Sequence, residues 1–591
     1  MSLAEDFFNE RNQHLFAWQD GPVIGSLSPD GWLNVIERDH AGGHRVLFRR
    51  ELDADAILFL GNRQVMARLY LQDDSRLTIA ETALDGKETH RWADLPSPET
   101  GAWTFHDVLE GTDRNGQDSL VLIVEDEEGN RRILEVSPSG EMGTHMLENA
   151  PPGELIYWNA AIDAAVLKED RGPWSPLLRL CVPSSGEVTG SVVGRWLDGQ
   201  DGTGVVLADA TDTGAEPSLS LWNLTDGALT ALHSSHGPYG WIEDARFIRG
   251  GTRRPSQLLA VRTVEADDRL DIIDPADGSV RPLGPDAPRS GRLRIRIANH
   301  TGIGLYGLST LDSSSWHWIS PQAAVATSVG QITAHPGKAA CRHAWLEHTP
   351  ALIYAPDRSP AAMVVSLHGG PESVERDELR WDGLYRELLD AGILVVGLNY
   401  AGSVSYGSDY QRQPWSDWQG AFQRDFNACL SEARARGIRP GSIALLGGSF
   451  GGSLALLGCV LNDQLAGAVA CAPLVDLRRH MNRAVAADTH YGRWFAERFT
   501  MAPDSTSPHP VFNPGRLSDT GHQPVYLIHG DQDEVINWED TAHAAALAKA
   551  HGRPWTFIQE RGMGHVPLSP EQSAERYQHV RNALHSVLGI A

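Results

Sequence analysis

Cysteine is scarce in this chain. Its 591 residues include only five cysteines, which stand singly and form no CxxC pair. This spacing argues against a disulfide framework and against a zinc site built on cysteine pairs, and it predicts buried thiols in a reducing, cytoplasmic compartment. The five are Cys181, Cys341, Cys429, Cys459 and Cys471.

Basic residues are also few relative to acidic ones. The 50 lysines and arginines are outnumbered by 76 aspartates and glutamates, which gives a formal net charge of −26. A balance this acidic argues against a general nucleic-acid binder and against a basic membrane-surface protein. Apolar runs of roughly 18 residues, the length that spans a membrane, are missing too. The start of the chain, MSLAEDFFNERNQHLFAW, lacks the basic-then-apolar order of a secretory signal. We therefore expect neither a nucleic-acid partner nor a membrane partner.

What the chain does have is size and two contrasting patterns. It is longer than a single hydrophobic core supports, so we expect two or more domains. Up to about residue 325, short β-type runs alternate with turns that recur at intervals of 35 to 54 residues. This period, with about four strands per unit, is typical of β-propeller blades. Seven turns predict a seven-bladed β-propeller over residues 21–325, and stacked β-sandwiches are the alternative. The turns lie at Gly42, Gly86, Gly140, Gly186, Gly227, Gly278 and Ser313.

The second pattern covers residues 326–591. Runs that are apolar on both faces alternate with helix-period segments, which predicts a mostly parallel sheet with helices on both faces. Functional residues are then expected just past the carboxyl ends of the strands. The apolar runs are 350–355, 362–368, 393–400, 443–448, 467–472, 524–530 and 555–560.

One serine lies where such chemistry is expected. The stretch GGSFGG places Ser449 between the strand IALLGG and the helix-period segment FGGSLALLGCVL. A G-x-S-x-G sequence at a strand–turn–helix junction is typical of a nucleophile elbow, in which glycines allow a strained serine to expose its hydroxyl. The alternative is that the glycines only allow close helix–strand packing.

A base and an acid follow in the required order. A serine nucleophile needs a histidine oriented by a carboxylate. Asp533, in HGDQDEV, lies 84 residues after Ser449, and His565, in RGMGHVP, lies 32 residues further on, each after a predicted strand. We expect these three to act together, with Asp531 and Glu534 as alternatives for the acid.

Two N–H donors for a developing oxyanion complete the prediction. One is the amide of Phe450, directly after the serine. The other comes from HGGP (368–371), where we expect the Gly370 amide, with Gly369 as the alternative. Taken alone, HGGP could also be an ordinary turn at the end of a strand.

These motifs together resemble the prolyl oligopeptidase family of serine peptidases, in particular its acylaminoacyl-peptidase and dipeptidyl-aminopeptidase-like branch. HGGP, NYAGSVSYG, GGSFGG, HGDQDEV and GMGH occur in the order found there. The resemblance implies an α/β-hydrolase domain, a triad of Ser449, Asp533 and His565, no metal and no cofactor. It also implies a helix within residues 1–20 that packs on the hydrolase domain, a cleft between the domains, and a propeller that excludes folded proteins.

The resemblance also suggests where a substrate pocket lies. The segment THYGRWFAERF follows the strand after which this family builds its pocket, and Tyr491, Trp494 and Phe495 could form an aromatic wall. Core packing of a small lid helix is the alternative.

Several positions depart from the family pattern. Ala401 stands where an arginine is frequent, Ser405 replaces a glycine, and Phe450 replaces a common tyrosine. After Asp533 the chain has Glu534 and Val535, where relatives hold the substrate backbone with an arginine or asparagine. The triad is unaffected, but substrate specificity is left open.

The sequence thus predicts a serine hydrolase that cleaves short peptides or aminoacyl and acylaminoacyl amides. An esterase or amidase for a specialised small acyl substrate is the alternative, and a non-catalytic propeller that binds partners is a further one. The oligomeric state is left open, a homo-oligomer included.

Overall fold

The computed structural model describes most of the chain. The ranges are 3–11, 13–18, 22–27, 32–38, 44–51, 55–60, 65–72, 76–82, 88–95, 104–125, 131–137, 139–146, 153–170, 176–208, 218–234, 241–248, 257–284, 291–299, 302–319, 325–330, 332–487, 489–500 and 507–590.

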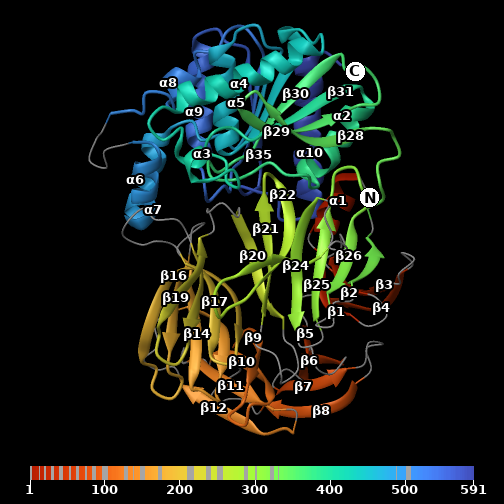
Figure 1. Cartoon of the computed structure of the whole chain (residues 1–591), viewed down its shortest axis with the longest axis vertical. Coiled ribbons are helices and arrows are strands. Elements are labelled where there is room, and N and C mark those ends of the chain that lie inside the picture. Colours follow the sequence, from red (N-terminus) through yellow and green to blue (C-terminus); the bar gives the residue numbers. More distant parts are fainter. Residues whose placement is uncertain are drawn as a thin grey trace.

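The first part consists of antiparallel strands in seven groups of four, called blades 1 to 7 here (Figure 1). Blade 1 has β1 (His14–Trp18), β2 (Pro22–Leu27), β3 (Trp32–Arg38) and β4 (His44–Glu51), and blade 2 has β5 (Asp55–Leu60), β6 (Val65–Gln72), β7 (Arg76–Thr82) and β8 (Glu88–Leu95). Blade 3 has β9 (Thr104–Thr112), β10 (Asp118–Glu125), β11 (Arg131–Val136) and β12 (Met142–Met146), and blade 4 has β13 (Glu154–Asn159), β14 (Ala164–Glu169), β15 (Leu177–Cys181) and the first half of β16 (Val188–Gln200). Blade 5 has the second half of β16, β17 (Thr203–Ala208), β18 (Ser218–Asn223) and β19 (Leu229–Ser234). Blade 6 has β20 (Trp241–Ile248), β21 (Gln257–Val264), β22 (Asp267–Ile273) and β23 (Val280–Pro282), and blade 7 has β24 (Arg292–Asn299), β25 (Gly302–Leu308), β26 (Ser315–Ile319) and β27 (Val325–Val329).

The blades close into a ring. From blade 1 to blade 4, and again from blade 5 to blade 7, the first strand of each blade contacts the first strand of the next, and contacts between β24 and β1 complete the circle. Blades 4 and 5 share β16, which pairs with β15 up to Val193 and with β17 from Gly194 onward. Gly194 has φ 155°, and a Cβ there would lie 2.2 Å from the carbonyl oxygen of Leu207, so only glycine fits this bend. The predicted seven-bladed propeller is confirmed.

The recurring turns mark one position of the blade. Gly140, Gly186, Gly227 and Gly278 all have positive φ and lie between the third and fourth strands of blades 3 to 6. The predicted turns at Gly42 and Gly86 lie outside the described residues. Ser313 was the wrong choice for blade 7, because it lies between the second and third strands, β25 and β26.

The second part contains one eight-stranded sheet, in the order β28-β29-β31-β30-β32-β33-β34-β35. Its strands are β28 (Ala340–Leu346), β29 (Thr349–Ala355), β30 (Ala362–Leu367), β31 (Ile393–Leu398), β32 (Ile443–Gly448), β33 (Gly467–Cys471), β34 (Val525–Gly530) and β35 (Trp555–Glu560). The last six strands of this order run parallel, and β28 and β29 form an antiparallel edge. β28 was not among the predicted strands, because much of it is exposed and it lacks a continuous apolar run. The α/β architecture is confirmed.

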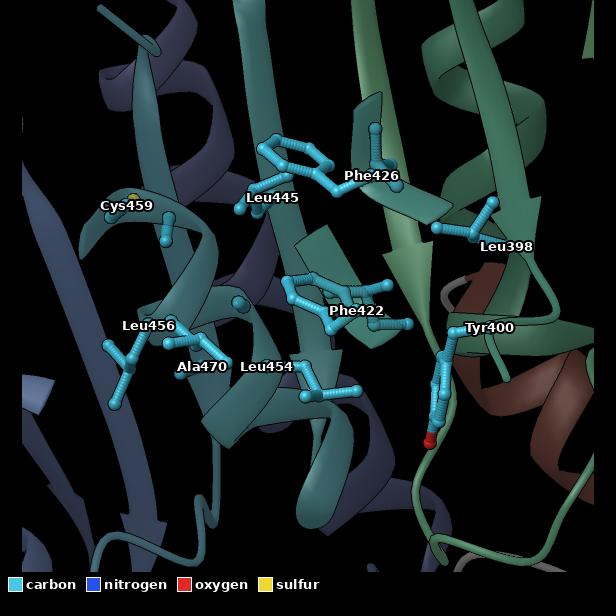
Figure 2. Packing of buried hydrophobic residues seen from close by; sticks show 14 of the residues in the cluster. Leu398, Tyr400, Phe422, Phe426, Leu445, Leu454, Leu456, Cys459 and Ala470 are labelled. Carbon is cyan, nitrogen blue, oxygen red and sulfur yellow. The ribbon is translucent and has the colours of Figure 1, made fainter. Parts of the chain in front are cut away.

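Helices cover both faces of this sheet. They are α2 (Leu384–Asp390), α3 (Ser408–Arg412), α4 (Trp418–Ala435), α5 (Phe450–Leu461), α6 (Leu477–Ala487), α7 (Thr489–Arg498), α8 (Pro514–Leu517), α9 (Trp538–Ala550), α10 (Pro570–Leu588) and the short 3₁₀ helices η1 (Arg380–Gly383) and η2 (Pro440–Ser442). Side chains of α4, α5 and α9 pack on one face, where Figure 2 shows Phe422 of α4 and Leu454 of α5 near Leu445 of β32. Side chains of α2 and α10 pack on the other face. Neighbouring strand residues such as Val364 and Val365 face opposite sides, as a strand requires. Within the described residues, no helix is both long and apolar enough to cross a membrane.

The N-terminal helix α1 (Leu3–Arg11) connects the two parts. It packs against α10 and η1 of the α/β part and also against β2 of blade 1. Its Phe7 is buried with Tyr306 of blade 7 and Leu379 of the α/β part. The strand groups extend beyond the expected boundaries, since β1 lies within the first 20 residues and β27 ends at Val329.

Candidate active site

Ser449 stands between a strand and a helix. β32 ends at Gly448, α5 begins at Phe450, and the serine between them has φ 55° and ψ −127°. A positive φ is costly for a residue with a Cβ, and such strain is found mainly at functional sites. The backbone N–H of Ser449 donates to the carbonyl oxygen of Cys471 on the neighbouring β33 (2.8 Å). The strand–turn–helix context of a nucleophile elbow is present.

The glycines around Ser449 are required by close backbone contacts. A Cβ on Gly447 would lie 2.2 Å from the carbonyl oxygen of Gly451. A Cβ on Gly451 would lie 2.1 Å from the carbonyl oxygen of Leu367, on β30. Because both neighbours are backbone atoms, they cannot turn away. The strained serine and the close helix–strand packing, which were alternatives in the sequence, therefore occur together.

Asp533 follows β34, and its side chain is buried. Its Oδ1 accepts hydrogen bonds from the backbone N–H groups of Val535 and Ile536, both at 2.8 Å. Its Oδ2 lies 2.7 Å from Nδ1 of His565 and 3.0 Å from Nε2 of His529. Burial alone would raise the pKa of Asp533, but the hydrogen bonds from the two histidines and from Ile536 outweigh it and hold that pKa well below its usual range. The carboxyl is therefore ionised at neutral pH.

The two alternative acids have other surroundings. The carboxylate of Asp531 accepts the backbone N–H of Gly562 (2.8 Å) and so closes the turn between the two loops. Glu534 is exposed. Of these three carboxylates, Asp533 is the one hydrogen-bonded to His565, because its backbone contacts turn it inward.

His565 lies in the loop after β35, with 18% of its side chain exposed. Gly530 lets this loop approach β34, since a Cβ there would lie 2.1 Å from the carbonyl oxygen of Met563. The backbone N–H of Gln532 donates to the same carbonyl (2.9 Å). Nδ1 of His565 faces an ionised carboxylate and therefore carries a proton, which leaves Nε2 as the acceptor of the neutral ring. The residues after β32, β34 and β35 share one edge of the sheet, since these strands are parallel.

The HGGP segment follows β30 and lies against the serine. A Cβ on Gly369 would be 3.1 Å from Cβ of Ser449 and 3.7 Å from its Oγ. Gly370 has φ 127°, a conformation that side chains rarely adopt, and its bond to Pro371 is cis. The backbone of this loop can approach the serine because Gly369 has no Cβ, and glycine at position 370 allows the positive φ of the turn.

The NYAGS segment holds this loop. The buried ring of His368 stacks on Tyr400, with ring centroids 4.3 Å apart, and the Tyr400 hydroxyl donates to the His368 carbonyl (2.9 Å). Nε2 of His368 lies 2.7 Å from Oγ of Ser403. Burial lowers the pKa of His368 to about 3, so this ring is neutral at physiological pH.

The departures from the family pattern have local explanations. Ala401 is buried, and its backbone N–H donates to Asp425 (2.7 Å). Ser405 keeps the positive φ (75°) expected of a glycine, and its Oγ accepts the backbone N–H of Ala266 in the propeller (3.3 Å).

The backbone and the ring of Phe450 have different surroundings. As the first residue of α5, its N–H has no acceptor within the helix. Its ring is 1% exposed and contacts Trp418 (4.9 Å between centroids), Phe499 (5.5 Å) and Phe512 (5.1 Å). These aromatic neighbours suit a phenylalanine, since a buried tyrosine hydroxyl would need a partner.

The three predicted pocket residues lie on α7. Phe495 is buried and stacks on Phe499 (5.5 Å), so the core-packing alternative describes it. Trp494 is only partly buried, with the guanidinium of Arg498 over its ring (4.4 Å). The side chain of Tyr491 lies outside the described residues.

Two features beside the site were not predicted. Nε of Arg498 lies 2.6 Å from Oε1 of Glu372, directly after HGGP, and this pair links α7 to the loop. No local pattern reveals a contact between residues 126 positions apart. The second feature is the contact of His529 with Asp533, for which the one available signal was a histidine inside the apolar strand VYLIHG. In the described part of the chain, no three His, Cys, Asp or Glu side chains are arranged to hold a metal ion.

Comparison with known sequences places this region in a family. Residues 383–590 match the model of the prolyl oligopeptidase family. Dipeptidyl aminopeptidase BIII of Pseudoxanthomonas mexicana is 23% identical over 222 residues, 36% of this chain and 32% of that protein. Dipeptidyl-peptidase 5 of Porphyromonas gingivalis is 23% identical over 257 residues, 40% and 36% of the two chains. The alignments thus span about a third of the length of these curated relatives.

Solved structures resemble nearly the whole chain. A puromycin-hydrolyzing peptidase of Mycobacterium tuberculosis covers 100% of this chain and 96% of its own, with a TM-score of 0.65 at 16% identity. Acylaminoacyl peptidase of Pyrococcus horikoshii covers 97% and 95%, with a TM-score of 0.70 at 13% identity. At these identities the likeness concerns the fold, which is shared over both domains. The family match thus covers residues 383–590, which resemble the prolyl oligopeptidase family of serine peptidases, while the rest of the chain shares the fold of these solved structures.

Proposed function

We propose that this protein hydrolyses short peptides, or aminoacyl and acylaminoacyl amides, through a triad of Ser449, His565 and Asp533. The observation that carries the proposal is the 2.7 Å contact between Nδ1 of His565 and Oδ2 of buried Asp533. It lies at the sheet edge where Ser449 occupies a strained turn before a helix. A purely structural turn would need neither a strained serine nor an oriented imidazole.

Acylation begins at the serine hydroxyl. Oγ of Ser449 attacks the substrate carbonyl carbon while Nε2 of His565 takes the hydroxyl proton. Asp533 holds the imidazole through Nδ1 and stabilises the imidazolium that forms. The developing oxyanion accepts hydrogen bonds from the backbone N–H of Phe450 and from that of Gly370 or Gly369.

Collapse of the tetrahedral intermediate breaks the bond to the leaving group. His565 returns its proton to the leaving amine, and the acyl group remains on Ser449. A water molecule then repeats the sequence in deacylation, with His565 again as base and then as acid, and the free serine is restored.

The propeller is proposed to exclude folded proteins. The loop that begins at HGGP continues into contacts with blades 6 and 7, such as Arg376 with Asp268 (3.1 Å) and Asp377 with Thr310 (2.9 Å). The propeller therefore lies on the side of the sheet that carries HGGP. A substrate would have to be small enough to pass between or through the domains.

Peptide or amide substrates are favoured by the relatives. Two curated relatives are called dipeptidyl peptidases or aminopeptidases, and structural neighbours are an acylaminoacyl peptidase and a puromycin-hydrolyzing peptidase. An esterase or amidase for a specialised acyl compound is the second candidate, favoured by the unusual residues Glu534 and Val535 after Asp533. A cytoplasmic location is also proposed, supported by five free cysteines.

A small chromogenic panel tests the function. It contains free aminoacyl, N-acetyl-aminoacyl and dipeptidyl nitroanilides and a short-chain nitrophenyl ester, assayed with the native protein and Ser449→Ala. We expect turnover of an amide class that the variant loses, and no cleavage of a folded protein. Ester turnover alone, lost in the variant, would favour the second candidate. Equal activity of variant and native protein, or no turnover with any substrate, would count against the proposal.

A further inference from the structure

The carboxylate of Asp533 has four hydrogen-bond donors. Two are the backbone N–H groups of Val535 and Ile536 on Oδ1, and two are the imidazoles of His565 and His529 on Oδ2. An ionised carboxylate offers about four lone-pair sites. Its capacity is therefore filled, and the predicted mechanism uses only one of its two histidines.

His529 can act only as a donor toward Asp533. It lies on β34 and is fully buried. Its Nε2 faces two acceptors, Oδ2 of Asp533 at 3.0 Å and the carbonyl oxygen of Ile536 at 3.1 Å. Neither can supply a proton while the carboxylate is ionised, so Nε2 of His529 carries one.

A hydroxyl group holds the other side of the ring. Nδ1 of His529 lies 2.9 Å from Oγ1 of Thr541 on α9, and the same Oγ1 is 3.4 Å from the carbonyl oxygen of Pro473. In a neutral ring the hydroxyl of Thr541 donates to Nδ1. Thr541 of helix α9 thus sets the orientation of His529, which in turn faces the carboxylate.

We propose that His529 is a positioning residue of the triad, whose N–H orients Asp533 and withdraws part of its negative charge from His565. The inference rests on the function proposed above. A carboxylate shared between two imidazole N–H groups attracts the His565 imidazolium less strongly than one held by His565 alone. Loss of the His529 donor should therefore make His565 harder to deprotonate and misorient the acid that steadies it.

The charged groups near His529 and Asp533 on the neighbouring helices form ion pairs with each other. Asp540 on α9 forms ion pairs with Arg479 and Arg483 of α6, both at 2.6 Å. On the other side, Arg576 of α10 is paired with Glu560 of β35 (2.5 Å) and approaches the carbonyl oxygen of His565 (3.5 Å).

Two further titratable groups complete the surroundings. His480 on α6 is a buried imidazole, and burial lowers its pKa to about 4, so it is neutral in the working range. Glu534, on the same loop as Asp533, is exposed. His529 therefore remains the imidazole, besides His565, that is hydrogen-bonded to Oδ2.

Three variants test the role. His529→Leu removes both ring nitrogens, His529→Gln keeps an N–H group at the position of Nε2, and Thr541→Val removes the hydroxyl that orients the ring. On the best substrate of the panel, we expect His529→Leu to lower kcat roughly 10- to 100-fold, the worth of one hydrogen bond to a charged group, with little change in KM. In the pH profile of kcat/KM, the midpoint of the rise on the acidic side should move to higher pH, and this rise is called the acid limb here. His529→Gln should restore most of the rate and the native limb, and Thr541→Val should fall between them.

Controls separate this inference from the function beneath it. A fluorophosphonate probe counts folded active sites in each variant, so that rates refer to competent protein. His317→Leu, at a buried histidine of the propeller, shows the effect of stability loss alone and should leave the acid limb in place. A His529→Leu variant with native kcat per labelled site and an unmoved limb would overturn the positioning role. If Ser449→Ala retained activity, the proposed function itself would fail instead.

Discussion

Nη1 of Arg376 lies 3.1 Å from Oδ1 of Asp268, and this buried ion pair joins the hydrolase domain to blade 6 of the propeller. The same guanidinium donates hydrogen bonds to Oγ1 of Thr263 (3.1 Å) and to a carboxylate oxygen of Glu243. Arg376 lies six residues after Gly370, on the loop that begins with HGGP. The interface with the propeller and the backbone beside Ser449 are therefore parts of one loop.

Arg376→Met should weaken both the domain interface and catalysis. The variant leaves the carboxylates of Asp268 and Glu243 buried without their main cation, which costs about 3–5 kcal/mol when a buried pair is broken. We expect a lower Tm in calorimetry and a lower kcat per folded active site, because the displaced loop carries the proposed oxyanion donor.

The double variant Arg376→Met/Asp268→Asn is the matched test. An asparagine can accept the N–H of Leu293 and donate to Thr263, so no isolated charge remains at that position. The double variant should regain part of the lost Tm, and strict additivity of the two single effects would contradict the pairing.

Asp533→Asn should abolish catalysis while leaving the fold intact. The amide cannot stabilise an imidazolium and favours the wrong histidine tautomer, so kcat should fall by about 10⁴-fold. Asp531→Asn is the control, because an asparagine there can still accept the N–H of Gly562. Steady-state kcat values of the two variants test whether Asp533 is the acid of the triad. A large loss of kcat in Asp531→Asn alone would assign that role to Asp531 instead.

Gly451→Ala should be severely destabilising although alanine favours helices. Its Cβ would lie 2.1 Å from the carbonyl oxygen of Leu367 and 2.4 Å from that of His368. Overpacking of this kind costs about 1–3 kcal/mol or more and should push α5 away from β30. Gly441→Ala, whose Cβ would meet nothing closer than 3.7 Å, is the control in thermal unfolding. Equal melting temperatures for the two variants would contradict the close packing.

Buried histidines should make the protein sensitive to acid. Burial lowers the pKa of His509 to about 4, and its Nδ1 accepts the N–H groups of Val511 (3.2 Å) and Phe512 (3.0 Å). Between this value and the usual pKa of about 6.5, the unfolded chain binds more protons than the folded one. Stability is therefore complete above about pH 6.5 and is lost as the pH falls toward 4.

His509→Asn isolates this contribution. The Oδ1 of asparagine can accept the same two N–H groups but does not titrate in this range. The free energy of unfolding of the variant, measured by denaturant titration between pH 7 and 4, should fall less steeply than that of the native protein. An unchanged slope would show that His509 binds its proton equally in the folded and the unfolded chain, and it would contradict the lowered pKa.

Much of the architecture could be read from local sequence signals. Turn glycines such as Gly186 and Gly227 need a positive φ, so their spacing reported the period of the blades. Apolar runs such as 443–448 reported buried parallel strands. The order of Ser449, Asp533 and His565 after such strands then predicted one edge of one sheet, because parallel strands bring their carboxyl ends together.

Other features depended on packing between distant residues. Asp531, Asp533 and Glu534 share one loop, and the inward turn of Asp533 is set by its hydrogen bonds to Val535 and Ile536. Arg376 meets Asp268 across 108 positions, and no periodicity records such a contact.

The sequence by itself determined the propeller, the parallel sheet and the candidate nucleophile, base and acid, since these follow from periodicity and turn chemistry within a few residues. Only the tertiary structure decided which carboxylate meets His565, that Phe495 belongs to the core, and that His529 shares Asp533. The physical reason is that side-chain directions are set when strands and helices pack, after the local pattern has been satisfied.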